Sequence, residues 1–263
     1  MYQVGIDVGS SAAKAVVMEG KTILKKVLLS TGFSSRQTAD QIYDLLAEAG
    51  FTKENARYVA AIVATGYGRV SVPHADQTVT EITCHAKGAQ VLFGGDGTVI
   101  DIGGQDTKGI ALKNGRVMKF IMNDKCSAGT GKFLEVMTNR LGLTQQELSD
   151  LASRGRHISI SSMCTVFAES EVISRLANGE RIEDIVAGIH TSVAKKVSGL
   201  AIRMGYRPRV AMSGGVAQNR GIVRAMEREL GCGITVPEDC QLAGAIGAAL
   251  FAYSDMEKIV NRR

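Results

Sequence analysis

Proline is scarce in this sequence, and long apolar runs are missing. Only 3 of the 263 residues are proline, while 45% are hydrophobic and 22% charged, a composition that excludes a largely disordered chain. No apolar run approaches the ~18 residues of a membrane span, and Tyr2 begins a strand-like pattern with no leader peptide before it. We therefore expect a cytoplasmic protein that has no membrane segment.

Regular spacings of histidine and cysteine are also missing. The 4 histidines show no H-x-x-x-H pattern and the 5 cysteines form no C-x-x-C pair, which argues against a common zinc site. An odd number of cysteines is not typical of a secreted disulfide framework, so they are reduced thiols or metal ligands. The formal net charge of +5 is small and the basic residues are scattered, so we expect no nucleic-acid partner.

Glycine is abundant, with 30 residues, and part of it belongs to an internal repeat. Residues 6–14 align without gaps on residues 100–108, with identical Asp, Gly and Lys in register. Chance is the alternative explanation for so short a repeat. If the repeat is real, each copy begins a three-stranded meander, because a second and a third apolar stretch follow at similar distances.

The pattern after each copy predicts an α/β protein built from two duplicated domains, residues 1–95 and residues 96–263. Strands followed by alternating helices and strands, twice over, are typical of two such domains facing one another. Helical periodicity covers 38–49, 80–92, 133–141, 166–177, 185–204, 222–230 and 242–253, and further strands are expected at 58–64, 210–212 and 233–236.

In both copies an acidic residue ends the first strand, and a glycine follows at the hairpin turn. Backbone N–H groups at such a turn can point at phosphate oxygens. Asp7 and Asp101 are then placed to hold a hydrated Mg²⁺ beside a polyphosphate. Ser10, Ser11 and Lys14 add hydroxyl donors and a cation. Asp and Gly are also ordinary turn residues, which is the structural alternative.

A third glycine-rich turn spans residues 212–219. It follows a predicted strand and opens a helix, the context in which backbone approaches a nucleotide. A plain strand-to-helix turn is the alternative. Gly131-Lys132 is not the end of a P-loop, because the required glycine is replaced by Cys126 and the required Ser or Thr by Phe133.

Cys126 and Cys164 both precede helical patterns, and Thr165 is the expected N-cap of the second helix. A thiolate at a helix N-terminus is stabilised by the dipole, which favours metal ligation. Iron-sulfur clusters usually need four thiolates, so two equivalent cysteines suggest a cluster shared by two copies of the chain. Inert buried cysteine is the alternative, and it is our expectation for Cys84, Cys232 and Cys240.

Taken together, these segments resemble the ATP-dependent activators of 2-hydroxyacyl-CoA dehydratases, which are related to the ATPase subunits of benzoyl-CoA reductase. That group lies in the actin, sugar-kinase and Hsp70-like ATPase superfamily, whose domains have the ribonuclease H-like fold and surround a nucleotide cleft. The most distinctive segments are 64–69, 100–106, 122–131, 161–171 and 213–219.

The resemblance implies a homodimer with one [4Fe-4S] cluster, ligated by Cys126 and Cys164 of each chain. It also implies ATP/ADP and Mg²⁺ as cofactors and ferredoxin or flavodoxin as the electron donor. The electron acceptor would be a 2-hydroxyacyl-CoA dehydratase or a double-cubane-cluster protein. Among relatives the first turn commonly reads Ser-Thr where Ser10-Ser11 stands here, which keeps the hydroxyl group.

On this basis Asp7 and Asp101 organise Mg²⁺ and water, and Gln105 orients the attacking water. The remaining nucleotide candidates fall in two groups. Phosphate contacts are assigned to Gly9, Ser10, Ser11, Lys14, Gly103 and Gly104, and adenosine-side contacts to Gly214, Gly215, Asn219, Gln241 and Gly244.

Two other functions compete with this one: a small-molecule kinase of the same fold, and a non-enzymatic actin-like assembly or chaperone module. A kinase would transfer phosphate to a substrate rather than to water. The chain has no obvious insertion for a sugar-binding or peptide-binding domain, which counts against both.

Overall fold

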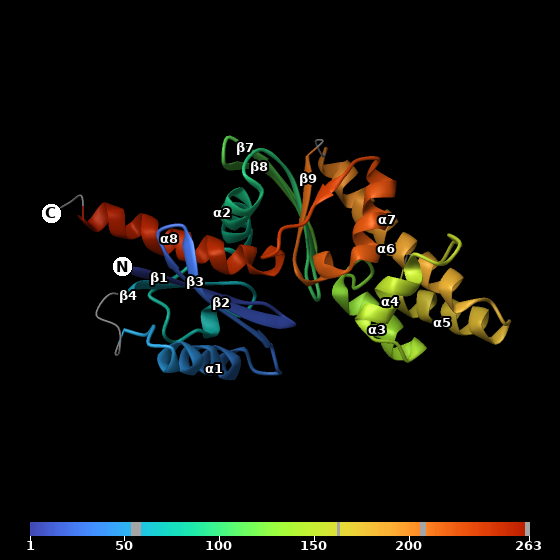
Figure 1. Ribbon diagram of the computed structural model, residues 1–263, viewed down its shortest axis with the longest axis horizontal. Coiled ribbons are helices and arrows are strands. Elements are labelled where there is room, and N and C mark those ends of the chain that lie inside the picture. The colour runs from blue at the N-terminus through green and yellow to red at the C-terminus, as the bar shows by residue number, and fades with distance from the viewer. Residues whose placement is uncertain (54–58, 162–163, 206–208, 261–263) are drawn as a thin grey trace. The chain divides into compact units, whose positions relative to one another are not determined.

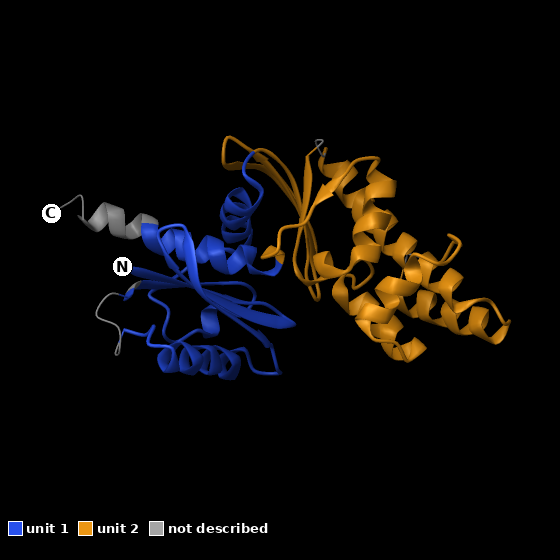
Figure 2. Ribbon diagram, viewed as in Figure 1, with its two compact units in different colours: residues 1–95, 241–263 blue, residues 96–240 orange. Residues whose placement is uncertain are grey.

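The computed structural model describes residues 1–53, 59–161, 164–205 and 209–260. The chain divides into two compact units. Unit 1 consists of residues 1–95 and 241–263, and unit 2 of residues 96–240 (Figure 2). Each unit contains a mixed five-stranded sheet covered by helices, in agreement with the predicted pair of α/β domains. No helix in the described part of the chain is long and apolar enough to cross a membrane.

The sheet of unit 1 has the strand order β3-β2-β1-β4-β5. The predicted meander is confirmed: β1, β2 and β3 pair antiparallel in sequence order, while β4 joins the other side of β1 in parallel. The strands are β1 (Tyr2–Val8), β2 (Ala12–Glu19), β3 (Thr22–Ser30), β4 (Val59–Thr65) and β5 (Gln77–Thr78).

Helices cover both faces of this sheet. On one face, helix α1 (Ser35–Glu48) buries Ala39, Ile42 and Leu46 against the strands. Its first turn is capped by the Ser34 hydroxyl, which accepts a hydrogen bond from the backbone of Gln37. On the other face, α2 (Glu81–Phe93) and α8 (Ala243–Val260) pack against each other, and α8 covers β1 and β4 (Figure 1).

The C-terminal segment corrects the predicted domain boundary. We expected residues 96–263 to form the second domain, but residues 241–263 belong to unit 1. The physical reason is the small-residue surface of α8, which allows very close packing on α2. A Cβ atom at Gly88 would lie 1.9 Å from the carbonyl oxygen of Ala243, so only glycine permits this crossing.

Unit 2 repeats the sheet of unit 1. Its order, β10-β9-β6-β7-β8, is the same arrangement of a central strand, an antiparallel meander on one side and parallel strands on the other. The strands are β6 (Gly97–Ile102), β7 (Thr107–Lys113), β8 (Arg116–Asn123), β9 (Val210–Ser213) and β10 (Ile234–Thr235).

The helices of unit 2 enclose its largest apolar core, in which Phe133 and Met137 pack with Ile102 and Met212 of the sheet. One helix, α4, was not predicted, although a capping box between Thr144 and Glu147 marks its start. The helices of unit 2 are α3 (Gly131–Leu141), α4 (Gln145–Ala152), α5 (Thr165–Ala177), α6 (Ile182–Met204) and α7 (Arg220–Leu230). Short 3-10 helices in the chain are η1 (Arg69–Ser71), which lies in unit 1, η2 (Gly215–Gln218) and η3 (Cys240–Leu242).

Candidate functional site

Asp7 lies at the centre of the first candidate site. Strand register places Lys14 of β2 on one side of it and Thr65 of β4 on the other. The side chain of Asp7 is buried, and its Oδ2 lies 3.3 Å from Lys14 Nζ. Its Oδ1 accepts no hydrogen bond from any residue that the structure describes. A buried carboxylate oxygen without a partner is costly unless a ligand occupies it.

Two glycines allow backbone to pass directly beside this carboxylate. Gly66 follows β4 with φ +88°, and a Cβ atom there would lie 2.4 Å from Asp7 Oδ1. A Cβ atom at Gly244 of α8 would lie 2.5 Å from Asp7 Oδ2. Gly244, which we predicted as an adenosine-side contact, thus lies against the carboxylate of Asp7. Gln241, the other candidate in this part of the sequence, lies partly buried in η3.

The hairpin turn that follows Asp7 is held from outside by Thr31. The Thr31 hydroxyl donates to the carbonyl of Gly9 over 2.9 Å, and the Thr31 amide donates to the carbonyl of Ser11 over 3.0 Å. Ser10 is half-buried and Ser11 exposed in this turn. The turn therefore has a fixed backbone with hydroxyl groups along it, as a phosphate contact requires.

Asp101 occupies the equivalent place in unit 2, but its carboxylate is more fully bonded than that of Asp7. The Ser213 hydroxyl donates to Asp101 Oδ1 over 2.8 Å, and Lys108 Nζ donates to Oδ2 over 3.4 Å. Lys108 is itself buried and forms a second ion pair with Asp106, at 2.7 Å. The backbone of Gly103 donates to the Asp106 carbonyl over 2.9 Å, which closes the second turn. Asp101 and its turn thus form one connected polar network.

The third glycine-rich turn continues from β9 beside this network. Gly214 has φ +85°, and a Cβ atom there would lie 2.3 Å from the Ile102 carbonyl oxygen. Gly215 is exposed at the start of η2, and Asn219 caps α7 by accepting from the backbone of Ile222 over 3.0 Å. The third turn thus packs against β6 at Gly214 and ends at the N-cap of α7.

The internal repeat is larger than the aligned sequence segments. Ser213-Gly214 in unit 2 corresponds to Thr65-Gly66 in unit 1: both pairs end the strand parallel to the Asp-bearing strand, and both glycines have positive φ. Sequence reasoning missed this third matched element. A hydroxyl residue followed by glycine at the end of an apolar strand was the signal that would have found it.

His190 of α6 lies behind the third turn and is almost completely buried. Its Nδ1 lies 2.9 Å from the Val186 carbonyl oxygen, and its Nε2 lies 3.3 Å from Asn219 Oδ1. Burial lowers the pKa of His190, and the charge of Arg228 acts in the same direction. His190 is therefore a buried contact between α6 and the residue that caps α7.

Cys126 is partly buried in the segment between β8 and α3. We expected it at the start of a helix, but α3 is capped by Thr130, so Cys126 lies in an irregular turn before the helix. Asn123 shapes this turn: its Nδ2 donates to the Cys126 carbonyl over 2.7 Å. Side-chain amides that bond to nearby backbone in this way are typical of turns rather than of helix interiors.

The start of α3, which follows the turn that carries Cys126, is hydrogen-bonded to the second Asp-x-Gly turn. The backbone of Gly131 donates to the Gly103 carbonyl over 2.9 Å, and the backbone of Lys132 donates to the Gly104 carbonyl over 2.7 Å. In addition, the buried Thr107 hydroxyl donates to the Gly129 carbonyl over 2.6 Å. These bonds tie residues 103–107 to the segment 129–132.

Cys164 is the N-cap residue of α5, one position before the N-cap we predicted at Thr165, and its side chain makes no capping hydrogen bond. The Thr165 hydroxyl lies 2.8 Å from the Ser127 hydroxyl, and either oxygen can donate. Because Ser127 follows Cys126 and Thr165 follows Cys164, this bond joins the two cysteine segments. Residues 162 and 163 of the predicted motif 161–171 lie outside the described residues.

The remaining cysteines have different surroundings. Cys84 is completely buried in α2, where burial raises the pKa of its thiol to about 12. Cys240 is also buried, and Cys232 is partly buried against the core of unit 2. All five cysteines are free thiols. Among the described residues, no three His, Cys, Asp or Glu side chains come together as a metal-binding group.

The sequence profile of the BadF/BadG/BcrA/BcrD ATPase family matches residues 4–252. This chain belongs to that family. The match covers both units, including both Asp-x-Gly turns and both cysteine segments. The actin-like ATPase fold of its structural neighbours agrees with the predicted fold class.

Relatives of this chain include proteins named as dehydratase activators. The chain is 46% identical to the 2-hydroxyisocaproyl-CoA dehydratase activator of Clostridioides difficile, over 98% of this chain and 97% of that protein. It is 47% identical to the (R)-2-hydroxyglutaryl-CoA dehydratase activating ATPase of Acidaminococcus fermentans, over 98% and 99%. A solved structure of the Clostridium difficile activator with bound ADPNP matches with a TM-score of 0.93 and 45% identity, over 100% of this chain and 98% of that one.

Proposed function

We propose that this member of the BadF/BadG/BcrA/BcrD ATPase family is an ATP-driven electron-transfer activator. Its acceptor would be a 2-hydroxyacyl-CoA dehydratase or a related double-cubane-cluster protein, and ferredoxin or flavodoxin would donate the electron. Two copies of the chain would share one [4Fe-4S] cluster. The names of the relatives, which include dehydratase activators and an activating ATPase, support the assignment of partner and activity.

The nucleotide chemistry is assigned to the Asp-x-Gly turns, one from each unit. Asp7 would bind a water molecule of the Mg²⁺ shell through its unpaired Oδ1, since a hard cation takes oxygen ligands and keeps several waters. Asp101, held by Lys108 and Ser213, would accept a hydrogen bond in one fixed direction. The exposed Gln105 would orient the attacking water, and backbone donors of the three turns would hold the phosphates.

The donor set of the cysteine segments fits an iron-sulfur cluster. Cys126 and Cys164 are partly exposed free thiols in joined segments, whereas Cys84 and Cys240 are buried. One chain offers two such thiolates and a cubane takes four, so a second copy would complete the set. When bound, the cluster would supply one-electron chemistry at a surface shared by the two subunits.

The observation that carries the proposal is the direct bonding between the second phosphate turn and the Cys126 segment. Gly131 and Lys132 donate to the carbonyls of Gly103 and Gly104, so a shift of the turn must move the start of α3 or break two backbone hydrogen bonds. Nucleotide binding at Gly103 and Gly104 would therefore act on the surroundings of Cys126. This coupling is the property expected of an ATP-driven electron carrier and is not required of a small-molecule kinase.

Iron and sulfide analysis of protein purified without oxygen tests the proposal. We expect a brown dimer with about four irons per dimer, and colourless protein from Cys126→Ser and Cys164→Ser. Cys232→Ser is the matched control, because it removes another partly buried thiol of unit 2 and should leave the colour unchanged; Cys84→Ser and Cys240→Ser should behave in the same way. Four irons per monomer, or colour that survives loss of Cys126 or Cys164, would refute the shared cluster. ATP-dependent phosphorylation of a small molecule by iron-free protein would favour the kinase instead.

A further inference from the structure

The segment that leads to Cys164, residues 155–161, is packed along α6. A Cβ atom at Gly155 would lie 1.9 Å from the Glu183 carbonyl oxygen, so backbone meets backbone at this point. The buried Asp184 carboxylate accepts from the backbone of Arg156 over 2.7 Å and also from its guanidinium. These contacts fix the beginning of the segment on the first turn of α6.

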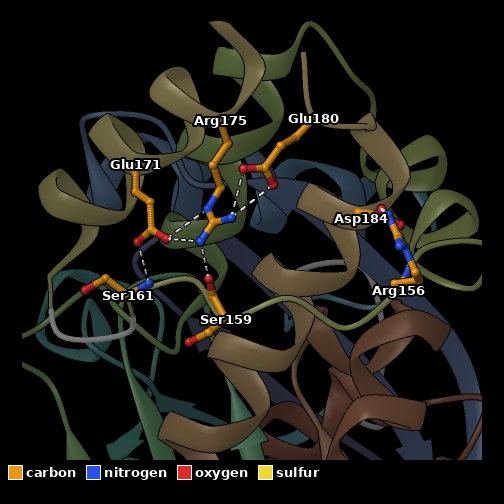
Figure 3. Close-up of polar contacts among 7 residues, drawn as sticks. All are labelled: Arg156, Ser159, Ser161, Glu171, Arg175, Glu180 and Asp184. Atoms are coloured by element: carbon orange, nitrogen blue, oxygen red, sulfur yellow. Dashed lines mark hydrogen bonds and ion pairs between the residues drawn. The ribbon is translucent and has the colours of Figure 1, made fainter. Parts of the chain in front are cut away.

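The end of the same segment is held by α5, the helix that starts at Cys164. Figure 3 shows the Arg175 guanidinium at the centre of this contact. Arg175 Nη2 donates to the Ser159 carbonyl over 2.8 Å, and Glu171 Oε2 accepts from the backbone of Ser161, also over 2.8 Å. Glu171 Oε1 accepts from Arg175 Nε and Nη2, and Glu180 accepts from Arg175 Nη1.

Residues 159–161 lie against α5, the helix that begins after Cys164. Glu171 and Arg175 lie two and three turns after Cys164, and both hold backbone atoms of residues 159–161, which lie just before Cys164. Hydrogen bonds to charged groups are stronger than neutral ones, and an arginine that uses three nitrogens has little rotational freedom left. Residues 159–161 are thus restrained from α5, whereas residues 129–132, which follow Cys126, are bonded to the phosphate turn.

Resting on the proposed function, we infer that Glu171 and Arg175 are positioning residues for Cys164. They hold the backbone of residues 159–161 beside the start of α5 through contacts that do not include the phosphate turn. Cys126 is then the ligand that responds to nucleotide, and Cys164 is the ligand that stays in place. Neither Glu171 nor Arg175 contacts nucleotide or substrate in this assignment, because their charges are used in bonds to each other, to Glu180 and to the backbone of the segment.

The test compares Arg175→Gln, Glu171→Ala and Glu171→Gln with wild type, all as full-length protein. Iron release to a chelator is followed in the anaerobic dimer, and the alkylation rates of Cys126 and Cys164 are then measured separately by mass spectrometry on the chelated chain. We expect alkylation at Cys164 to rise on the order of tenfold in Arg175→Gln and Glu171→Ala, the factor that corresponds to one lost charged hydrogen bond. Glu171→Gln keeps an amide oxygen for the Ser161 amide and should give a smaller rise.

Arg140→Gln is the matched control. Arg140 of α3 forms an ion pair with Glu169 of α5, the helix that also carries Glu171 and Arg175, but it makes none of their contacts to residues 159–161. Its Cys164 alkylation should stay at the wild-type rate. Added Mg-ADPNP should change alkylation at Cys126 and leave Cys164 unchanged in wild type.

Equal acceleration at both cysteines in Arg175→Gln, or none at Cys164 in any folded variant, would overturn the assignment. If Arg175→Gln does not fold, Glu171→Gln decides the question in the same way. A protein that never binds iron would refute the shared cluster, and the alkylation ratio would still judge the positioning role separately.

Discussion

The Ser213 hydroxyl donates a hydrogen bond of 2.8 Å to Asp101 Oδ1, and no described residue donates to the equivalent oxygen of Asp7. The two aspartates occupy the same place in two copies of one sheet, with a lysine on the antiparallel neighbour and a hydroxyl residue on the parallel one. Despite this symmetry, Asp101 belongs to a bonded network and Asp7 has one oxygen without a protein partner. The duplicated turns are therefore chemically unequal.

Replacing either aspartate by asparagine should abolish ATP hydrolysis, because each change removes charge beside the metal. The two variants should differ in stability. Asp101→Asn leaves the buried Lys108 with Asp106 as its remaining carboxylate, and we expect it to lower the free energy of unfolding by about 1–3 kcal/mol. Asp7→Asn should cost less, since Lys14 is partly exposed. Phosphate release and urea unfolding measure the two effects, and full activity in Asp101→Asn would remove this residue from the mechanism.

Gly244→Ala should reduce hydrolysis by displacing Asp7. The new methyl group would lie 2.5 Å from Asp7 Oδ2, so the carboxylate must move. Gly199→Ala is the matched control: it is also a helical glycine, but its Cβ atom would have no atom within 4 Å. Alanine there should leave hydrolysis unchanged and raise the free energy of unfolding by up to about 1 kcal/mol. Unchanged ATPase activity in Gly244→Ala would show that the position of Asp7 is not critical.

Electron delivery to the partner should need ATP, whereas initial reduction of the cluster should not. Dithionite-reduced protein is mixed with the partner enzyme, and cluster oxidation is followed with and without ATP. Thr107→Val removes the hydroxyl bonded to Gly129 and should weaken the ATP effect. Thr138→Val is its control, because the Thr138 hydroxyl bonds to the carbonyl of Glu135 and to the side chain of Gln145 and not to residues 103–107 or 129–132. Equal oxidation rates with and without ATP in wild type would exclude the coupling.

Stability should fall in mild acid because of His190. Burial lowers its pKa in the folded protein, so the unfolded chain binds the proton more readily. The contribution is fully present above the ordinary histidine pKa of about 6.5, and it is lost as the pH falls below that value toward the lowered pKa of the native state. Urea unfolding across this range should show a smaller pH dependence in His190→Gln than in wild type. His157→Gln, at an exposed histidine, should keep the wild-type dependence.

Much of the fold was readable from local patterns. The apolar strands that carry Asp7 and Asp101, and the periodic helices such as α6, are long enough to show their period clearly. Helix α4 is short, and its capping box at Thr144 and Glu147 was the available but overlooked signal. Cys126 precedes α3 as predicted, but the turn in which it lies, where the amide of Asn123 bonds to its carbonyl, was not predicted. Side-chain bonds to backbone of this kind leave no periodic trace.

The amino-acid sequence by itself determined the two α/β units, the duplicated Asp-x-Gly turns and the family, because strand and helix periods and short motifs are properties of neighbouring residues. Only the tertiary structure decided which contacts these pieces make. In the tertiary structure α8 belongs to unit 1, and the Ser213 hydroxyl bonds to Asp101. Gly131 bonds to the second Asp-x-Gly turn, and Arg175 bonds to the backbone of residues 159–161. These contacts join residues far apart in the chain, and they depend on which surfaces can approach within hydrogen-bond distance, a property of packing rather than of local pattern.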